Sequence, residues 1–167
     1  MPQTEANSQR VTKPPAIRAA KFDDLAAILA VERSAHRAAH WSAEHYEERI
    51  RNQPAAACFL VAESGDKTTI LGFLCARIIG IAGEWEIENV VVDEEFRRQG
   101  IGSLLMQSLV DNWEASAGRV LLLEVRESNT AARALYERHG LSEVGRRRAY
   151  YRDPAEDAIL YSRRREA

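Results

Sequence analysis

The chain has 167 residues, of which 46% are hydrophobic, and its formal net charge is −2. This length predicts one domain that buries roughly two-thirds of its surface, and this composition excludes a disordered chain. A net charge near zero provides no general attraction to nucleic acids or membranes, so any attraction to a charged partner must be local.

The N-terminal segment predicts a tail. Residues 1–15 are polar and lack the apolar segment of a signal peptide, and no apolar run approaches the ~18 residues that span a bilayer. We therefore expect a cytoplasmic protein with a flexible tail over 1–15 and one domain over 16–165. Cys58 and Cys75 fall on neighbouring predicted strands, without a Cys-x-x-Cys spacing or a His cluster. This pattern favours reduced thiols and no metal site.

The first elements of the domain are a strand and two helices. Residues 17–20, Ile-Arg-Ala-Ala, predict a short first strand. Asp23 or Asp24 then caps a helix whose apolar residues recur at helical spacing, and a second helix begins at Ser42.

The middle of the chain predicts an antiparallel hairpin and a third strand. Apolar runs at 58–62 and 69–76 flank a Gly-containing turn. The next strand alternates polar and apolar residues, and Glu84, Glu86 and Glu88 share one of its faces. We expect that face to be solvated.

The second half continues with two helices and three strands. An amphipathic segment follows residues 97–103, and a mostly apolar strand at 120–125 comes next. Asn129 caps a helix over 130–139, and two further strands lie at 142–145 and 158–161. The predicted order β-α-α-β-β-β-α-β-α-β-β is an α+β fold around a mixed, mostly antiparallel sheet.

A glycine-rich turn between a strand and a helix is the most informative segment. Backbone N–H groups and the positive end of the helix dipole converge at such a turn, and glycines allow a phosphate to approach closely. No Gly-Lys-Ser/Thr follows, which excludes a Walker-type NTPase, and two glycines are too few for the dinucleotide fingerprint. Packing alone also explains turns of this kind. The turn contains Arg97, Arg98, Gln99, Gly100, Ile101, Gly102 and Ser103.

The turn resembles the Arg/Gln-x-x-Gly-x-Gly/Ala turn of the GCN5-related N-acetyltransferase (GNAT) superfamily. Later segments resemble the bacterial ribosomal-protein alanine N-acetyltransferases (RimI type), in register from about Ile17 to Tyr161. The chain has Leu141 where this family usually has Phe, Ala149 where Asn is frequent, and His40 before Trp41 where Pro is usual. The matching segments are 123–129, 131–140, 146–151 and 156–158.

The resemblance implies a single-domain GNAT fold and acetyl-coenzyme A (acetyl-CoA) as cosubstrate. It further implies acetylation of the N-terminal α-amine of a protein, with a small-subunit ribosomal protein as partner and no metal. Asn129 resembles an asparagine that contacts coenzyme A, although its role as a helix cap explains it equally well. The other implied cofactor residues are Val90, Val91 and Val92 and the turn residues Arg97, Arg98, Gln99, Gly100, Ile101, Gly102 and Ser103.

Acetyl transfer needs a base and benefits from an acid, because an α-amine with a pKa near ~7.7–8 is partly protonated at neutral pH. Glu124 is a carboxylate in an otherwise apolar strand, where burial would make it a better proton acceptor, and the family assigns the matching glutamate this role. A solvent-facing pair with Arg126 is the alternative. The resemblance makes Tyr136 the acid, whereas without it Tyr136 is an ordinary core aromatic. Glu88 is the reserve base.

Three other functions stay open from the sequence. The enzyme could acetylate a small-molecule amine or a protein lysine, or the chain could be a non-catalytic module that binds coenzyme A or the ribosome. The arginine runs 146–148 and 163–165 allow RNA binding, but without an RNA-binding aromatic motif we expect a solvated strand, a charged terminus and no direct nucleic-acid contact.

Overall fold

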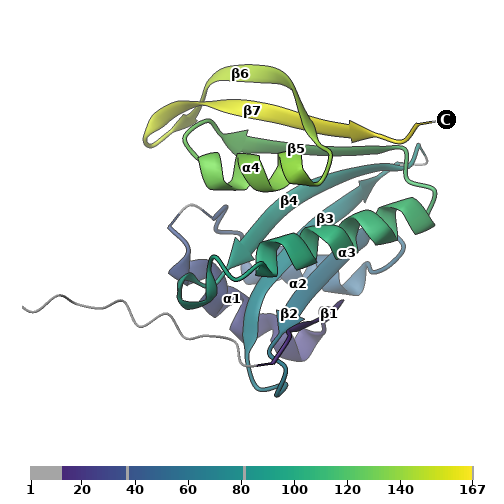
Figure 1. Ribbon diagram of the computed structural model, residues 1–167, viewed down its shortest axis with the longest axis vertical. Helices are drawn as coiled ribbons and strands as arrows, with labels where there is room; N and C mark the ends of the chain where they lie inside the picture. The colour runs from purple at the N-terminus through teal and green to yellow at the C-terminus, as the bar shows by residue number, and fades with distance from the viewer. Residues whose placement is uncertain (1–12, 37, 81, 167) are drawn as a thin grey trace, which may run out of the picture.

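The computed structural model describes residues 13–36, 38–80 and 82–166, which fold around one seven-stranded sheet (Figure 1). The strand order is β1-β2-β3-β4-β5-β7-β6, with β4 and β5 parallel and the other neighbours antiparallel. The predicted fold class and element order are therefore confirmed. The strands are β1 (Ala16–Ala19), β2 (Ala57–Glu63), β3 (Ile70–Ile79), β4 (Glu84–Val92), β5 (Val120–Arg126), β6 (Ser142–Arg152) and β7 (Ala155–Arg164).

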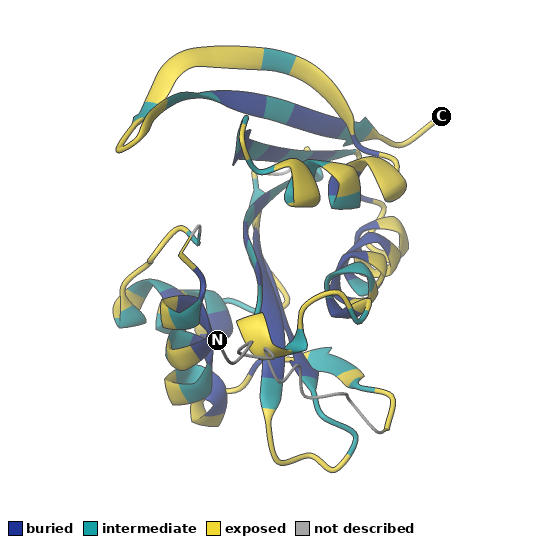
Figure 2. Cartoon of the chain, turned by 60° about the vertical axis from the view of Figure 1, so that its left-hand side comes forward, coloured by how far each residue is buried: buried dark blue, intermediate teal, exposed yellow. Residues whose placement is uncertain are grey.

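Helices cover both faces of the sheet (Figure 2). On one face α1 (Leu25–Ser34) and α2 (Ala43–Arg51) enclose a core that includes Tyr46, Phe59 and Phe73. On the other face α3 (Ile101–Ala115) and α4 (Thr130–Arg138) cover a larger apolar cluster around Trp113 and Tyr161. No helix among the described residues is long and apolar enough to cross a membrane. Short 3₁₀ helices lie at Phe22–Asp24 and Glu94–Phe96.

The predicted helix start at Ser42 and the predicted cap at Asn129 are confirmed. The side chains of Ser42 and Asn129 accept backbone hydrogen bonds in the first turns of α2 and α4, at 3.2 and 3.3 Å. Asp24 is the N-cap residue of α1, as the sequence predicts, but its side chain makes no cap hydrogen bond, because its carboxylate contacts the guanidinium of Arg18 on β1 at 2.7 Å. The charge-assisted pair with Arg18 is stronger than a bond to a neutral backbone N–H.

The two cysteines lie on neighbouring strands, as predicted, but on opposite faces of the sheet, because Cys58 of β2 pairs with Ala76 whereas Cys75 of β3 pairs with Phe59. Both are free and buried, in agreement with the predicted reduced thiols. Burial raises the pKa of the Cys58 thiol to about 12, so it stays protonated near pH 7. The predicted tail over 1–15 lies mostly outside the described residues, and its boundary stays a prediction.

The sheet opens in its middle. The parallel ladder between β4 and β5 joins Glu84–Glu86 to Val120–Leu122 and stops there. On the opposite edge of β4 the register with β3 shifts, because Cys75 pairs with Asn89 and Ala76 pairs with Ile87, which leaves Glu88 as the extra residue of a β-bulge. The backbone of β4 that follows the bulge therefore lacks a strand partner on its β5 side.

Candidate active site

Two adjoining cavities lie where β4 and β5 separate. The first, of about 640 Å³, is lined by the turn before α3, by Val90–Val92 and by α4, and we call it the α3 cavity. The second, of about 620 Å³, lies between the loop before α2, β4, β5 and the β6–β7 hairpin, and we call it the α2 cavity. The two cavities share Ala38, Val90, Asn129, Ala132 and Tyr136.

The glycine-rich turn forms one wall of the α3 cavity. Gly100 is the N-cap of α3 and has a φ of 80°, a left-handed conformation that favours glycine. The N–H of Leu104 donates to the Gly100 carbonyl at 3.0 Å, so the N–H groups of 101–103 precede the helical ladder. A Cβ at Gly102 would lie 3.3 Å from the Leu135 side chain, which leaves little room for one. The turn therefore has the open N–H groups and helix dipole that bind a phosphate.

Polar side chains fix this turn from two sides. The Nε of Arg97 donates to the Val92 carbonyl at 3.2 Å, which ties the turn to the end of β4. The Ser103 hydroxyl lies 2.9 Å from Nε2 of His139, just after α4. Burial, together with the charges of Arg138 and Arg163, lowers the pKa of His139, so this ring is neutral near pH 7.

Ten of the eleven predicted cofactor residues line the α3 cavity, and Gln99 of the turn does not. The ten are Val90, Val91, Val92, Arg97, Arg98, Gly100, Ile101, Gly102, Ser103 and Asn129.

Glu124 lines the α2 cavity but is less enclosed than predicted. Its side chain is 24% exposed, because β5 has no pairing with β4 at this point, and its Oε1 lies 2.9 Å from Nε of Arg147 on β6. The ion pair between Glu124 and Arg126, which the sequence left open as an alternative, does not form. Arg126 instead contacts Glu156 at 2.9 Å, and its guanidinium lies 4.1 Å from the ring centroid of Tyr151.

Tyr136 lies at the junction of the two cavities. The residue is 8% exposed, and its ring contacts the main core near Tyr161, at 6.2 Å between centroids. Among the described residues, its hydroxyl has no hydrogen-bond partner. Burial, with a smaller contribution from Tyr151, raises the pKa of this phenol. Tyr136 is therefore a core aromatic that also presents a protonated hydroxyl to the cavities.

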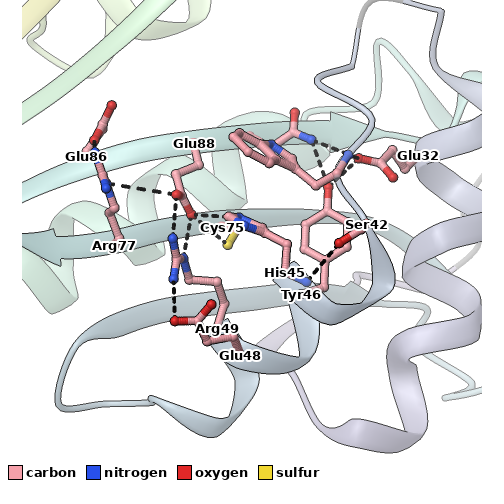
Figure 3. Close-up of polar contacts among 12 residues, drawn as sticks. Glu32, Ser42, His45, Tyr46, Glu48, Arg49, Cys75, Arg77, Glu86 and Glu88 are labelled. Carbon is pink, nitrogen blue, oxygen red and sulfur yellow. Dashed lines mark hydrogen bonds and ion pairs between the residues drawn. The ribbon is translucent and has the colours of Figure 1, made fainter.

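The prediction of a solvated glutamate face on β4 is wrong for Glu88 (Figure 3). Its side chain is 7% exposed and receives hydrogen bonds of 2.8 and 2.9 Å from Arg49 of α2. His45 Nε2 lies 3.4 Å away, and the Cys75 thiol lies at 3.6 Å. Burial alone would raise the pKa of Glu88, but the bonds and charge of Arg49 and the charge of His45 outweigh it, and the pKa is lowered.

A buried carboxylate that the sequence analysis missed holds the loop above the α2 cavity. Glu32 of α1 is 3% exposed and accepts hydrogen bonds from the Trp41 backbone N–H, at 2.9 Å, and from the Tyr46 hydroxyl. Asn89, beside the bulge, donates to the Tyr46 oxygen at 3.1 Å. The sequence held one signal, because Glu32 follows the apolar Ile28 by four positions and so falls on the buried side of the helix.

Comparison with known proteins identifies the family. The acetyltransferase (GNAT) family profile matches residues 22–141. The chain belongs to this family. The [ribosomal protein bS18]-alanine N-acetyltransferase of Escherichia coli K12 is 36% identical over 143 residues, which cover 82% of this chain and 88% of the relative. The crystal structure of the E. coli ribosomal-protein-S18-alanine N-acetyltransferase superposes with a TM-score of 0.76 at 33% identity, over 89% of this chain and 92% of that one.

A further relative is the N-alpha-acetyltransferase RimI of Mycobacterium tuberculosis, which is 42% identical over 84 residues, or 50% of each chain. These relatives confirm the predicted resemblance and the enzyme class, an N-acetyltransferase. GNAT acetyltransferases use acetyl-CoA as the acetyl donor, and this chain is a member of that family.

The departures from the family pattern have local structural correlates. His40 has a φ of 35°, a value that the proline usual at this position cannot adopt, so the loop before Trp41 has its own conformation. Ala149 has a φ of 48°, in the left-handed region where asparagine is tolerated better than alanine. Leu141 is 2% exposed and fills part of the core.

Proposed function

We propose that this GNAT enzyme acetylates the N-terminal α-amine of a protein, by direct transfer from acetyl-CoA, and that its acceptor is the alanine of a small-subunit ribosomal protein. The names of the E. coli and M. tuberculosis relatives support this acceptor class. The observation that carries the proposal is the meeting of the two cavities at Val90 and Tyr136, with an anion-binding turn on one side and a carboxylate on the other.

The α3 cavity fits acetyl-CoA. The N–H groups of 101–103 would hold the pyrophosphate, with Arg98 beside them. The backbone of Val90–Val92 is paired with β3 but open toward β5, so it can bind the amide groups of the pantetheine arm. The thioester would then lie near Tyr136, where the cavities join.

The α2 cavity supplies the proton chemistry. Glu124 would take a proton from the acceptor ammonium, and the free amine nitrogen would attack the thioester carbonyl carbon. The carbon–sulfur bond would then break as Tyr136 gives its proton to the departing thiolate. The nitrogen would lose its second proton, which restores the Tyr136 phenol by way of solvent in the cavity, so the products are an amide, the coenzyme A thiol and a protonated Glu124. Glu88 is less suited to be the base, because Arg49 occupies both of its oxygens.

The aromatic residues of the α2 cavity favour a peptide acceptor. Trp41 and Tyr150 line the cavity and are 38% and 49% exposed. Trp41 stacks on His45 with ring centroids 4.2 Å apart, which holds its ring at the rim. Exposed aromatic rings around a groove can enclose an extended chain while backbone groups fix its direction.

Competition among acceptors tests this function. A peptide that begins with Ala should release coenzyme A thiol from acetyl-CoA and gain one acetyl group at its α-amine, as located by mass spectrometry. The same peptide with its α-amine masked and one lysine free should not react. Faster acetylation of spermidine, or of the lysine in the masked peptide, would favour a small amine or a side chain as the true acceptor.

A further inference from the structure

The carboxylates of the α2 cavity all have arginine partners. Three carboxylates line it, and each forms an ion pair within the described part of the chain. A cationic α-ammonium that enters the cavity therefore meets only carboxylates that already have a counter-ion, and it competes with an arginine for the carboxylate that it reaches. The three pairs are Glu86 with Arg77, Glu88 with Arg49, and Glu124 with Arg147.

These pairs differ in how firmly they are held. Glu88 is 7% exposed, and both of its oxygens accept hydrogen bonds from an arginine that is 14% exposed. Two side-chain nitrogens of Arg77, on the neighbouring strand, contact one carboxylate oxygen of Glu86. Glu124 contacts one nitrogen of Arg147, and the arginine side chain is 56% exposed. Exposed single-contact pairs are the weakest kind of ion pair, so this one is the easiest to displace.

Arg147 also lies near an aromatic ring while it is paired with Glu124. It lies on the edge strand β6, where the register with β7 shifts between Arg147 and Tyr151. Its guanidinium is 5.5 Å from the ring centroid of Tyr150, a distance at which the cation still interacts with the ring. In the described residues its ion pairing is confined to Glu124. The guanidinium can therefore leave Glu124 without breaking another ion pair.

We infer that Arg147 is a displaceable counter-ion of Glu124, which holds the place of the acceptor's α-ammonium in the free enzyme and gives way to it when the peptide binds. This inference rests on the proposed function. It assigns Arg147 a role in selecting acceptors that carry a positive charge at the reacting nitrogen. Acetylation removes that charge, so Arg147 returns to Glu124 and the neutral product loses its attraction to the site.

Calorimetry with two matched peptides tests the exchange. The enzyme is saturated with coenzyme A and titrated with an Ala peptide or with the same peptide already acetylated. Arg147→Gln should bind the free-amine peptide about two- to fivefold more tightly, as expected for the loss of an exposed ion pair, and should bind the acetylated peptide unchanged. Arg147→Lys keeps the charge and should match the wild type. Arg148→Gln, which removes the same charge one residue away, is the control.

Two results would overturn the inference. Equal changes for both peptides would show a general effect on the cavity, and weaker binding of the free amine would show that Arg147 itself binds the acceptor. In a Glu124→Gln background, the inference requires that Arg147→Gln has no further effect on the free-amine peptide.

A spectroscopic measurement separates this inference from the proposed function. The ¹⁵N resonance of Arg147 Nε–H in the free enzyme should shift in Glu124→Gln and stay in place in Glu86→Gln, without any acceptor present. Turnover of the Ala peptide tests the function independently. If the ¹⁵N resonance of Arg147 is unchanged in Glu124→Gln, the counter-ion role is refuted even if the peptide is acetylated.

Discussion

Arg49 of α2 donates two hydrogen bonds to the carboxylate of Glu88, at 2.8 and 2.9 Å, and so joins the helix layer to the bulge of β4 (Figure 3). Both side chains are mostly buried, at 14% and 7% exposed. The pair fixes α2, and with it the loop that ends at Trp41, against the opening between β4 and β5. Two of the three glutamates that line the α2 cavity thus differ, since Glu88 holds the wall, whereas Glu124 is the one proposed to face the acceptor.

Glu88→Gln should therefore lower the stability of the fold more than it lowers turnover. We expect a loss of about 1.5–3 kcal/mol in the free energy of unfolding at pH 7, because Arg49 loses a charged partner. The pKa of Glu88 is below its usual value of 4.5 in the folded state. Its contribution is thus complete above that value and is lost as the pH falls through the folded-state pKa.

Urea unfolding of the wild type and Glu88→Gln, between pH 7 and pH 3, measures this contribution. The difference in stability between the two proteins should shrink at the acid end. Glu86→Gln, on the same strand but at 29% exposed, is the control and should cost about 1 kcal/mol or less. A pH-independent difference would contradict the assigned pair.

Glu124→Gln should leave the fold and acetyl-CoA affinity intact while kcat falls by about 10²–10⁴, because the amide cannot accept the ammonium proton. The change keeps the shape of the side chain in a cavity that is already open to solvent. Steady-state turnover with the Ala peptide and calorimetry with coenzyme A measure the two effects. If Glu88→Gln reduces kcat in this way and Glu124→Gln does not, the base is Glu88.

Tyr136→Phe removes the hydroxyl at the junction of the cavities and keeps the ring in the core. Because the hydroxyl has no hydrogen-bond partner among the described residues, we expect the unfolding free energy to change little. Turnover should fall, since the departing thiolate loses its proton donor. A thiol-release assay and thermal unfolding check both expectations, and wild-type turnover would make Tyr136 a core aromatic alone.

Gly102→Asp should abolish acetyl-CoA binding, whereas Gly102→Ala should weaken it moderately. A Cβ at this position would lie 3.3 Å from the Leu135 side chain, so a small shift accommodates alanine. Aspartate adds a negative charge beside the N–H groups that are proposed to bind the pyrophosphate. Calorimetry with acetyl-CoA gives the affinities, and circular dichroism gives the fold content. Equal affinities for all three proteins would remove the turn from the cofactor site.

The sequence predicted those features that are encoded in neighbouring residues. The Gly100–Ser103 turn, the helix start at Ser42, the cap at Asn129 and the order of the elements follow from local chemistry, and the structure reproduces them. The resemblance supplied the roles of Glu124 and Tyr136, which are still proposals.

The solvated face expected for Glu88, and the Glu124–Arg126 pair left open as an alternative, both fail because of partners far away in the sequence. Glu88 is buried because a bulge and Arg49, 39 residues earlier, enclose it. Glu124 pairs with Arg147 rather than Arg126, because β7 and β6 lie beside β5 in the sheet. Neither the register of a bulge nor the order of strands can be read from the alternation of side chains within one strand.

Glu32→Gln tests the support of the acceptor loop. The amide keeps an acceptor for the Trp41 N–H but weakens the charge-assisted bond from the Tyr46 hydroxyl. We expect KM for the Ala peptide to rise several-fold, with kcat and acetyl-CoA affinity nearly unchanged, since the loop lies on the acceptor side. Tyr46→Phe should have the same effect. A fall in kcat without a change in KM would instead place this network in the chemistry.

Replacement of Ala149 should stabilise the enzyme. Its φ of 48° costs an alanine about 1–2 kcal/mol, and glycine avoids this cost. Its N–H donates to Asp157 at 2.8 Å, and Ala149→Gly keeps that bond. We expect the free energy of unfolding of Ala149→Gly to rise by about 1 kcal/mol, which corresponds to about 2–4 °C in Tm. Calorimetry measures this change. Ala155→Gly, in the adjacent strand without a positive φ, is the control and should destabilise by about 0.5–1 kcal/mol. If both variants lose stability alike, the left-handed backbone at Ala149 carries no strain.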